Sequence, residues 1–588
     1  MQEDKMESTY RGSVLLRLLS YMKPYWGQVL LSLILVLGLT GLELYRPVLI
    51  GDAVDLFQEQ GNYDVIVETA VKYGIVLVLS FFFTVVPIWL LQKVGQRILL
   101  AVRKELYAHI QQLSSRYFDL TPVGKLVTRV TNDVEALNEM YSGILVRLFR
   151  NIVKIAGLAV VMLILDWRLA LISFVLLPVV VLLTVIFRKI SRKTYRITRT
   201  RLTDLNTFLS ENLSGMRIIQ LFGREERKFE EFNDKNYKYY KAFYREMLVF
   251  AIFRPLIYIL SVLSLMLVLG MGSRDVLGQV ISIGTLYIFA QYIQSFFDPI
   301  QELAEQFSTL QSSLASGEKI FAIMDETAQV PESEEPVILP EIKGRIEFDH
   351  VWFAYDDENY VLRDVSFVIE PGQSVAFVGA TGAGKSSILN LIGRYYDIQQ
   401  GHIYIDGVDI RDLSKKQLRS AIGQMQQDVF IFEGTVESNI RLYNEEITPE
   451  EIRAAAEYVN ASRFIEKLPN GYQEPVSERG STFSAGERQL LSFARTLAHK
   501  PSILVMDEAT ANIDTETELL IQEALEKLMK GRTTIMVAHR LSTIQHADCI
   551  MVMHKGKIRE QGTHQELLAR NGIYKKLYEL QIHHEITA

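Results

Sequence analysis

The long apolar runs of this 588-residue chain are confined to about its first 320 residues. A helix needs about 20 mainly apolar residues to cross the hydrocarbon core of a bilayer. The remainder of the chain contains only short apolar runs, so one common core is excluded and two or more domains are expected. Six stretches are long enough to cross, although some reach this length only when adjacent residues are included. They are about 27–50, 66–91, 144–165, 167–187, 247–271 and 279–300.

This uneven distribution predicts a division into three parts. Residues 1–322 are expected to form an α-helical transmembrane domain with six spans and long cytoplasmic helix extensions. An amphipathic interfacial segment, about 14–25, precedes the first span. A stretch rich in Thr, Glu, Ser and Pro predicts a linker over 323–343. Residues 344–588 are expected to form a separate α/β domain, because strand alternation begins near residue 345.

The distribution of charge predicts the orientation in the membrane. The loop 51–64 carries four acidic residues and no Lys or Arg, whereas the next connection and the segment 188–246 are rich in both. By the positive-inside rule, the long connections and both termini are cytoplasmic, and we expect a multi-pass protein of the cell membrane. A net charge of −7 argues against a nucleic-acid partner.

Two of the cytoplasmic connections are expected to be helical. Residues 92–113 and 192–213 keep apolar residues at helical spacing with charges between them. Each is followed by a turn region, 117–124 and 210–223, that is a candidate for a short helix docking on a cytosolic domain. Within the spans, Glu43 and Arg46 stand one turn apart near the outer end of the first. We expect them to pair or to be solvated at the interface rather than to bind a substrate.

A glycine-rich loop lies between a predicted buried strand at 374–378 and a predicted helix. It has the Walker A pattern in the strand–loop–helix context that this motif requires. Its backbone N–H groups can face phosphate oxygens, Lys385 can neutralise the β- and γ-phosphates, and the Ser386 hydroxyl can ligate Mg²⁺. The predicted nucleotide-binding residues here are Gly379, Ala380, Thr381, Gly382, Ala383, Gly384, Lys385, Ser386 and Ser387.

Two further buried strands end in polar residues. Residues 503–506 lead into Asp507 and Glu508, and residues 533–538 lead into His539. Asp507 suits the shell of a Mg²⁺ ion, and Glu508 can polarise a water for attack on the γ-phosphate. His539 is expected at the sheet edge where ligands bind, so a contact with the γ-phosphate is favoured over a purely structural role. Glu508 and His539 are the candidate catalytic residues.

At these residues the chain resembles the ATP-binding cassette (ABC) family, specifically an exporter half-transporter of the type I fold, over essentially its whole length. The resemblance implies that ATP and Mg²⁺ are cofactors and that two nucleotide domains close head-to-tail around two ATP molecules. It implies that Tyr355 stacks on adenine, that Gln427 senses Mg²⁺ and the membrane domain, and that Asp514 lies in the interface loop. Gln426 and Ala511 depart from the usual Pro and Ser, and 478–480 matches the loop that contacts the coupling helices.

The loop expected to complete the partner's ATP site is altered. The family has Leu-Ser-Gly-Gly-Gln where this chain has Phe483 followed by Ser484, Ala485, Gly486 and Glu487. Ala485 adds a methyl group where backbone approaches a phosphate, and Glu487 adds a negative charge near a polyanion. The same four residues also form a capping box for the helix that follows, which is compatible with weakened ATP contact.

An apparently complete Walker side and a compromised signature side favour a heterodimer with a second ABC half-transporter, although a homodimer stays open. The chain then resembles the subunit that carries the catalytic glutamate in bacterial heterodimeric multidrug exporters. The resemblance implies ATP-driven export of hydrophobic or amphipathic small molecules through the lipid bilayer. A lipid flippase or peptide exporter is the alternative cargo class, and an ATP-gated channel or regulator is the rival class.

Overall fold

The computed structural model describes residues 13–327, 330–356, 359–426, 429–477, 480–507, 515–537 and 544–587. The chain divides into two compact units. The helical unit comprises residues 1–111 and 123–326. The α/β unit comprises residues 327–588 together with the short segment 112–122, which lies within the membrane half of the sequence.

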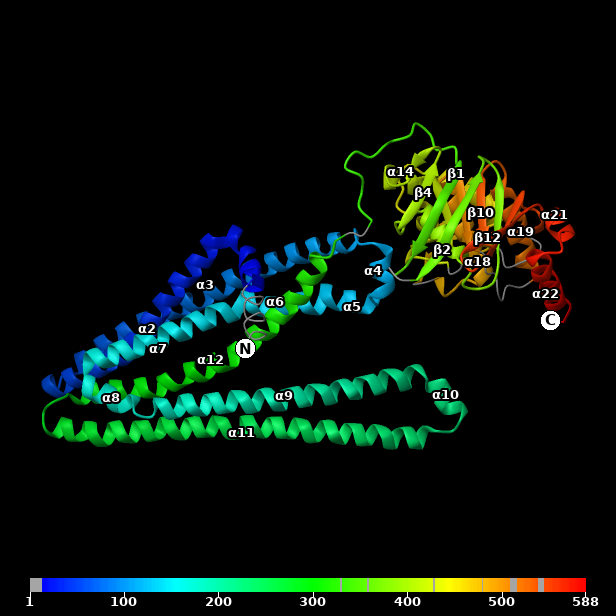
Figure 1. The fold of residues 1–588 in the computed structure, drawn as a ribbon. Coiled ribbons are helices and arrows are strands. Elements are labelled where there is room, and N and C mark those ends of the chain that lie inside the picture. The colour runs from blue at the N-terminus through cyan, green and yellow to red at the C-terminus, as the bar shows by residue number, and fades with distance from the viewer. Residues whose placement is uncertain are drawn as a thin grey trace. The chain divides into compact units, whose positions relative to one another are not determined.

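The helical unit is built from long helices joined by short turns (Figure 1). A helix at 13–20 and a 3-10 turn, η1 (Lys23–Tyr25), precede the first long helix. Four short helical segments, two of them π-helical turns, precede α7. The bounds are α2 (Trp26–Gln60), α3 (Tyr63–Ile110), α5 (Val123–Thr128), η2 (Arg129–Asp133), α6 (Val134–Glu139), η3 (Met140–Ile144), α7 (Leu145–Leu165), α8 (Trp167–Phe174), α9 (Leu177–Ser214), α10 (Met216–Leu221), α11 (Glu225–Leu277) and α12 (Ile283–Met324).

Five continuous helical stretches in the described part of the chain are long and apolar enough to cross a membrane. They contain the first five predicted spans. The sixth predicted span lies in the first half of α12, which is not among the five. Gln291, Gln294 and Asp298 lower the apolar character of this stretch. The number six therefore rests on α12 crossing the membrane together with the more apolar helices.

The helices extend well beyond bilayer thickness, as the helical spacing predicts. α3 has 48 residues and α11 has 53. At 1.5 Å per residue they are about 70 and 80 Å long, against about 30 Å of hydrocarbon. Figure 1 shows α9 and α11 side by side, joined at one end by α10, which has no buried residue. The other predicted turn region forms α4 (Ser115–Leu120), within the α/β unit.

The α/β unit contains two main sheets. The larger has the order β12-β11-β3-β10-β9-β6, with parallel strands except for β12. The smaller is antiparallel, with the order β2-β1-β4-β5. The bounds are β1 (Ile346–Ala354), β2 (Tyr360–Ile369), β3 (Ser374–Val378), β4 (Gln400–Ile405), β5 (Val408–Asp409), β6 (Ile422–Met425), β9 (Ile503–Asp507), β10 (Thr533–Val537), β11 (Cys549–His554) and β12 (Lys557–Gly562).

Short strands and helices complete the α/β unit. Between β6 and β9 the chain is mainly helical, and α18 carries the altered signature loop at its start. The bounds are α13 (Lys385–Ile392), α14 (Lys415–Ser420), β7 (Gly434–Thr435), α15 (Val436–Arg441), α16 (Pro449–Tyr458), α17 (Ser462–Ile465), η4 (Gly471–Gln473), β8 (Pro475–Val476), α18 (Ala485–Ala498), α19 (Thr515–Met529), α21 (His564–Ala569) and α22 (Ile573–Thr587).

Both faces of the parallel sheet are buried, which explains why its strands are almost continuously apolar. Successive side chains of a strand point to opposite faces. In β3, Val375 and Phe377 pack into one hydrophobic cluster, while Ala376 and Val378 pack into another. The sheet is therefore held rigidly from both sides, and the loops that follow β3, β9 and β10 begin from fixed points.

The later part of α2 and the start of α12 approach closely, at Gly51 and Gly284. A Cβ atom on Gly284 would lie 2.1 Å from the Gly51 carbonyl oxygen. The Gly284 N–H donates to Asp55 Oδ1 at 2.7 Å, so the contact is polar as well as tight.

Gly284→Ala is expected to lower the apparent melting temperature of the purified transporter, because overpacking typically costs about 1–3 kcal/mol. Gly270→Ala is the matched control, because a Cβ there meets nothing within 4 Å. Its expected effect is neutral or slightly stabilising, since Ala favours a helix over Gly. Equal melting temperatures for the two variants would contradict the close approach of α2 and α12.

Candidate nucleotide site

The glycine-rich loop runs from the end of β3 to the start of α13, as its spacing predicts. All three of its glycines have positive φ angles, and at two of them an added side chain would also clash. Gly379 has φ +152°, and a Cβ there would lie 2.3 Å from the Met553 carbonyl oxygen. Gly384 has φ +103°, and a Cβ there would lie 2.7 Å from Leu362. The backbone can therefore come close to a bound group only because these side chains are missing.

Lys385, the first residue of α13, points back over this loop. Its Nζ donates to the carbonyl oxygens of Gly379 at 2.7 Å and Ala380 at 3.2 Å. The side chain is 6% exposed. Burial lowers the pKa of Lys385, and the nearby charge of Asp507 opposes that shift. A buried ammonium beside a ring of backbone N–H groups is well suited to phosphate oxygens.

The carboxyl ends of the central strands meet beside this loop. Asp507 ends β9 and is paired in register with Val537, the last residue of β10. Val537 in turn is paired with Phe377 of β3. The side chain of Asp507 therefore starts from the edge at which the glycine loop begins, as expected for parallel strands. Ser386 and Ser387 follow in the first turn of α13.

Tyr355, directly after β1, lies against the same helix. Its hydroxyl forms a hydrogen bond with Ser387 Oγ at 3.0 Å and accepts one from Asn390 Nδ2 at 3.4 Å. Its ring meets those of Phe353 and Tyr396 edge-on, with centroids 4.8 and 5.1 Å apart. The structure thus brings together Tyr355, the glycine loop and Asp507, which lie far apart in the sequence.

The altered signature residues form the start of α18. Ser484 is the N-cap, and its Oγ accepts from the Glu487 N–H at 3.2 Å. The Ser484 N–H donates to Glu487 Oε2 at 2.8 Å. The capping box is therefore formed, and the Glu487 carboxylate accepts the backbone N–H of the N-cap residue. Ala485 is exposed and Gly486 is buried.

Several predicted residues lie outside the part of the chain that the structure describes. They include both candidate catalytic residues, so the roles assigned to them stay predictions. They are Gln427, Glu478, Arg479, Glu508, Ala511, Asp514 and His539.

Comparison with known proteins identifies a family for both the helical unit and the α/β unit that holds this site. Residues 29–300 match the model of the ABC transporter transmembrane region, and residues 362–511 match the ABC transporter model. An ABC transporter ATP-binding protein of Streptococcus pneumoniae is 42% identical over 97% of both chains. The chain belongs to the ABC transporter family. It is an exporter of the type that couples ATP hydrolysis to transport across a membrane.

Other relatives of this exporter carry more specific names. A protein of Bacillus subtilis named as a probable multidrug resistance ABC transporter is 41% identical over 87% of this chain and 76% of its own length. A fatty acid transporter of Mycobacterium tuberculosis and a lipid A-core flippase of Desulfotalea psychrophila match at 38% and 35% identity, over 83% and 94% of this chain. The solved structure of a bacterial Atm1-family ABC exporter with ATP bound superposes with a TM-score of 0.79 and 26% identity, covering 95% of this chain and 98% of its own.

The exporter's α/β unit contains a contact that sequence reasoning missed. The Tyr396 hydroxyl donates to the carboxylate of Asp119, in α4. Burial, and then this hydrogen bond, raise the pKa of Tyr396. Because the Tyr396 ring also touches Tyr355, a continuous contact runs from the loop between α3 and α5 to the predicted adenine-stacking residue. The spacing of apolar and polar residues reports on neighbours within a helix or strand. It carries no information about two residues as far apart in the sequence as Asp119 and Tyr396.

Tyr396→Phe is expected to lower the ratio of cargo-stimulated to basal ATP hydrolysis at least threefold. It leaves Asp119 without its donor but keeps the ring against Tyr355, so the half-saturating ATP concentration should stay within twofold. Tyr395→Phe is the matched control, because its hydroxyl donates to Gln424 Oε1 at 2.8 Å instead. An equal loss of stimulation in both variants would argue against the α4 contact.

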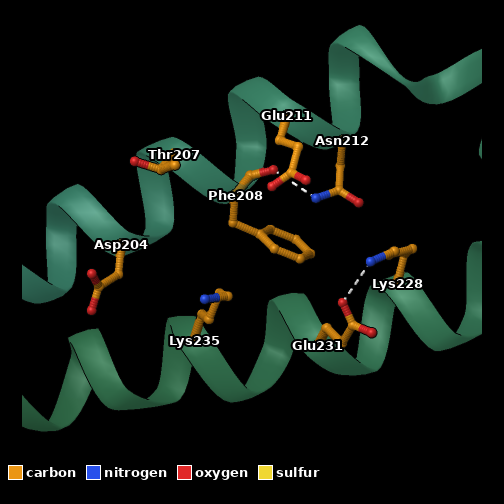
Figure 2. Close-up of a pocket in the computed structure, with 8 residues that line it drawn as sticks. All are labelled: Asp204, Thr207, Phe208, Glu211, Asn212, Lys228, Glu231 and Lys235. Carbon is orange, nitrogen blue, oxygen red and sulfur yellow. Dashed lines mark hydrogen bonds and ion pairs between the residues drawn. The ribbon is translucent and has the colours of Figure 1, made fainter.

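In the helical unit, a polar cavity of about 360 Å³ lies between α9 and α11. Figure 2 shows the Phe208 ring of α9 directed between Lys228 and Lys235 of α11. The two ammonium groups lie 5.8 and 5.6 Å from the ring centroid. Lys228 also pairs with Glu231 at 2.7 Å. The lining holds three carboxylates and two ammonium groups, so its charge is mostly compensated. The two cation–π contacts with Phe208 hold α9 and α11 together.

Proposed function

We propose that this chain is one half of a heterodimeric exporter that uses ATP hydrolysis to expel hydrophobic or amphipathic compounds across the cell membrane, with its nucleotide domain in the cytoplasm. The observation that carries the proposal is the contrast within the α/β unit. The Walker loop has a buried Lys385, positive-φ glycines and Asp507 beside it. The signature loop carries a carboxylate, Glu487, that accepts the Ser484 N–H.

The nucleotide-binding roles follow from the chemistry of each group. Lys385 and the loop N–H groups hold the phosphates, and Tyr355 stacks on adenine. Glu508 orients the attacking water, and His539 contacts the γ-phosphate. ATP lies between these residues and the partner's signature loop, while Ser484 and Gly486 face the partner's ATP. Asp514 lies at the domain interface.

The donor set fits a Mg²⁺ ion. The Ser386 hydroxyl and Asp507 carboxylate are hard oxygen donors of the kind Mg²⁺ prefers, with Gln427 adding an amide oxygen. When bound, Mg²⁺ neutralises charge that develops on the phosphates.

The heterodimer follows from a conflict at the signature loop. In a homodimer, both ATP molecules would face Glu487, whose carboxylate accepts the Ser484 N–H and carries the same sign of charge as a phosphate. In a heterodimer, Glu508 of this chain works with an unaltered loop from its partner, and the site facing Glu487 binds ATP less productively. Multidrug cargo is favoured by the relative from Bacillus subtilis, while fatty acids and lipids are the alternative.

Native mass spectrometry of the complex, isolated from its own membranes through a tag on this chain, tests the heterodimer. We expect a second half-transporter of similar mass, with an unaltered signature loop and a substituted catalytic carboxylate. Two copies of this chain that hydrolyse ATP and transport at full rate would overturn the proposal.

Glu508→Gln tests the pump against the ATP-gated channel. We expect steady-state ATP hydrolysis to fall at least 100-fold, because the group that orients water is neutralised, and net transport to stop. ATP binding, measured by equilibrium dialysis, should stay within a few-fold. A variant that continued to pass cargo after adding ATP would identify a binding-gated channel.

A further inference from the structure

The linker that follows α12 is fastened to the α/β unit close to its start. Lys415 Nζ donates to the Val330 carbonyl oxygen at 2.8 Å, and the Lys415 N–H donates to Glu332 Oε1 at 2.9 Å. Arg394 donates to the Pro331 carbonyl oxygen at 3.0 Å. Two cationic residues of the α/β unit therefore hold three consecutive linker residues. We call these five residues the linker clamp.

Arg394 is the buried centre of this clamp. Its side chain is 3% exposed, and its Nε donates to Asp397 Oδ1 at 3.0 Å. Its guanidinium also donates to the carbonyl oxygens of Ile410 and Arg411, at 3.2 and 3.1 Å. Desolvation offsets much of what a buried ion pair contributes to stability, and the φ of +47° costs further free energy. What Arg394 fixes is the position of the linker against the turn after α13.

Arg394 begins a run of three residues that each contact a different segment. The next residue, Tyr395, donates its hydroxyl hydrogen to Gln424 Oε1 of β6 at 2.8 Å. Tyr396 donates to Asp119 of α4, and its ring also meets the predicted adenine-stacking residue. The linker, β6 and α4 therefore converge on one turn, at the end of the helix that begins at the glycine loop.

The end of α12 is anchored as well, within the helical unit. Arg17 Nη1 donates to both carboxylate oxygens of Asp325, at 2.6 and 2.8 Å. His109 Nε2 of α3 lies 3.1 Å from the Glu326 carbonyl oxygen. These contacts hold the end of α12 to the helix at 13–20 and to α3, so it moves with the helical unit.

Little slack lies between these two anchored ends. Val330 follows Asp325 by five residues, which span at most about 18 Å when fully extended. A long flexible segment would absorb a displacement of α12. A short segment that is held at both ends passes the displacement on.

We propose that the linker clamp couples α12 to the nucleotide site, with Arg394 as the positioning residue. A displacement of α12 pulls on the clamped linker, and Arg394 passes it to the end of α13, whose first residue is Lys385. This route acts beside the contact of Asp119 with Tyr396, and the two routes meet in one turn. The inference goes beyond the proposed function, because it requires neither a heterodimer nor a particular cargo.

The test changes the length of the connection in the complete complex, reconstituted in nanodiscs. One variant carries a four-residue Gly/Ser insertion after Thr327, ahead of the clamp. This raises the maximum span from Asp325 to Val330 to about 32 Å. The matched control carries the same insertion between Glu334 and Glu335, which are exposed and lie beyond the clamp.

Spin labels at Tyr63→Cys and Leu277→Cys, in a Cys549→Ala background, report the distance between the start of α3 and the end of α11. Both labelled positions are exposed. Trapping with ATP and vanadate is expected to change this distance in the parent and in the control insertion. The insertion after Thr327 should reduce the change at least twofold. Basal ATP hydrolysis should stay within twofold, because the insertion leaves the glycine loop unaltered.

Arg394→Gln should match the insertion after Thr327, and combining the two should cause no further loss, because both release the same connection. If Arg394→Gln fails to fold, the pair of insertions still decides. An equal distance change in the parent and all variants, or an equal reduction by both insertions, would overturn the proposal. The proposed function is tested separately, by Glu508→Gln and by mass spectrometry, so either result can fail without the other.

Discussion

Every backbone polar group of a lipid-exposed segment must find its hydrogen-bond partner within the protein, and the helical unit is organised by that requirement. Loops cannot lie in the hydrocarbon, so the chain leaves it as helix and continues as helix. α3, α9 and α11 therefore run far beyond bilayer thickness before they turn. A rigid helix transmits displacement along its whole length, which makes the distant turns at α4 and α10 suitable points for coupling.

The α/β unit meets a different requirement, which is to hold charge at a fixed point. Its parallel strands are buried on both faces, and their carboxyl ends supply the start of the glycine loop and Asp507. Among the described residues, carbonyl oxygens and a nearby carboxylate are what stabilise the buried Lys385 there. Desolvation makes the ammonium a stronger attractor of phosphate than an exposed lysine would be. Tyr355 directly follows β1 of the smaller sheet, and its ring touches that of Tyr396, so movement of α4 reaches the nucleotide side by direct contact.

Local features of both units could be predicted from sequence, because they depend on neighbours within a few residues. The length of apolar runs indicated the membrane helices, the 374–387 pattern indicated β3, loop and α13, and Ser484 with Glu487 indicated a capping box. Contacts between distant segments could not be predicted in the same way. Glu43 pairs with α7 because Gly157 lets Leu44 approach, and Asp119 meets Tyr396 across a large sequence separation. Neither leaves a periodic signal.

In the signature loop, the residue that best caps its own helix is unfavourable for the ATP that the partner chain would bring. A carboxylate at the third position of a helix caps its N-terminus well, since it satisfies a free N–H and complements the helix dipole. Glu487 does this for Ser484 at 2.8 Å. A phosphate brought by another chain would approach a carboxylate that carries the same sign of charge. A glutamine could form the same cap without that charge, so the difference between Glu and Gln bears on the facing ATP more than on the stability of α18. The exporter can therefore keep a well-formed helix while making one of its two ATP sites unlike the other.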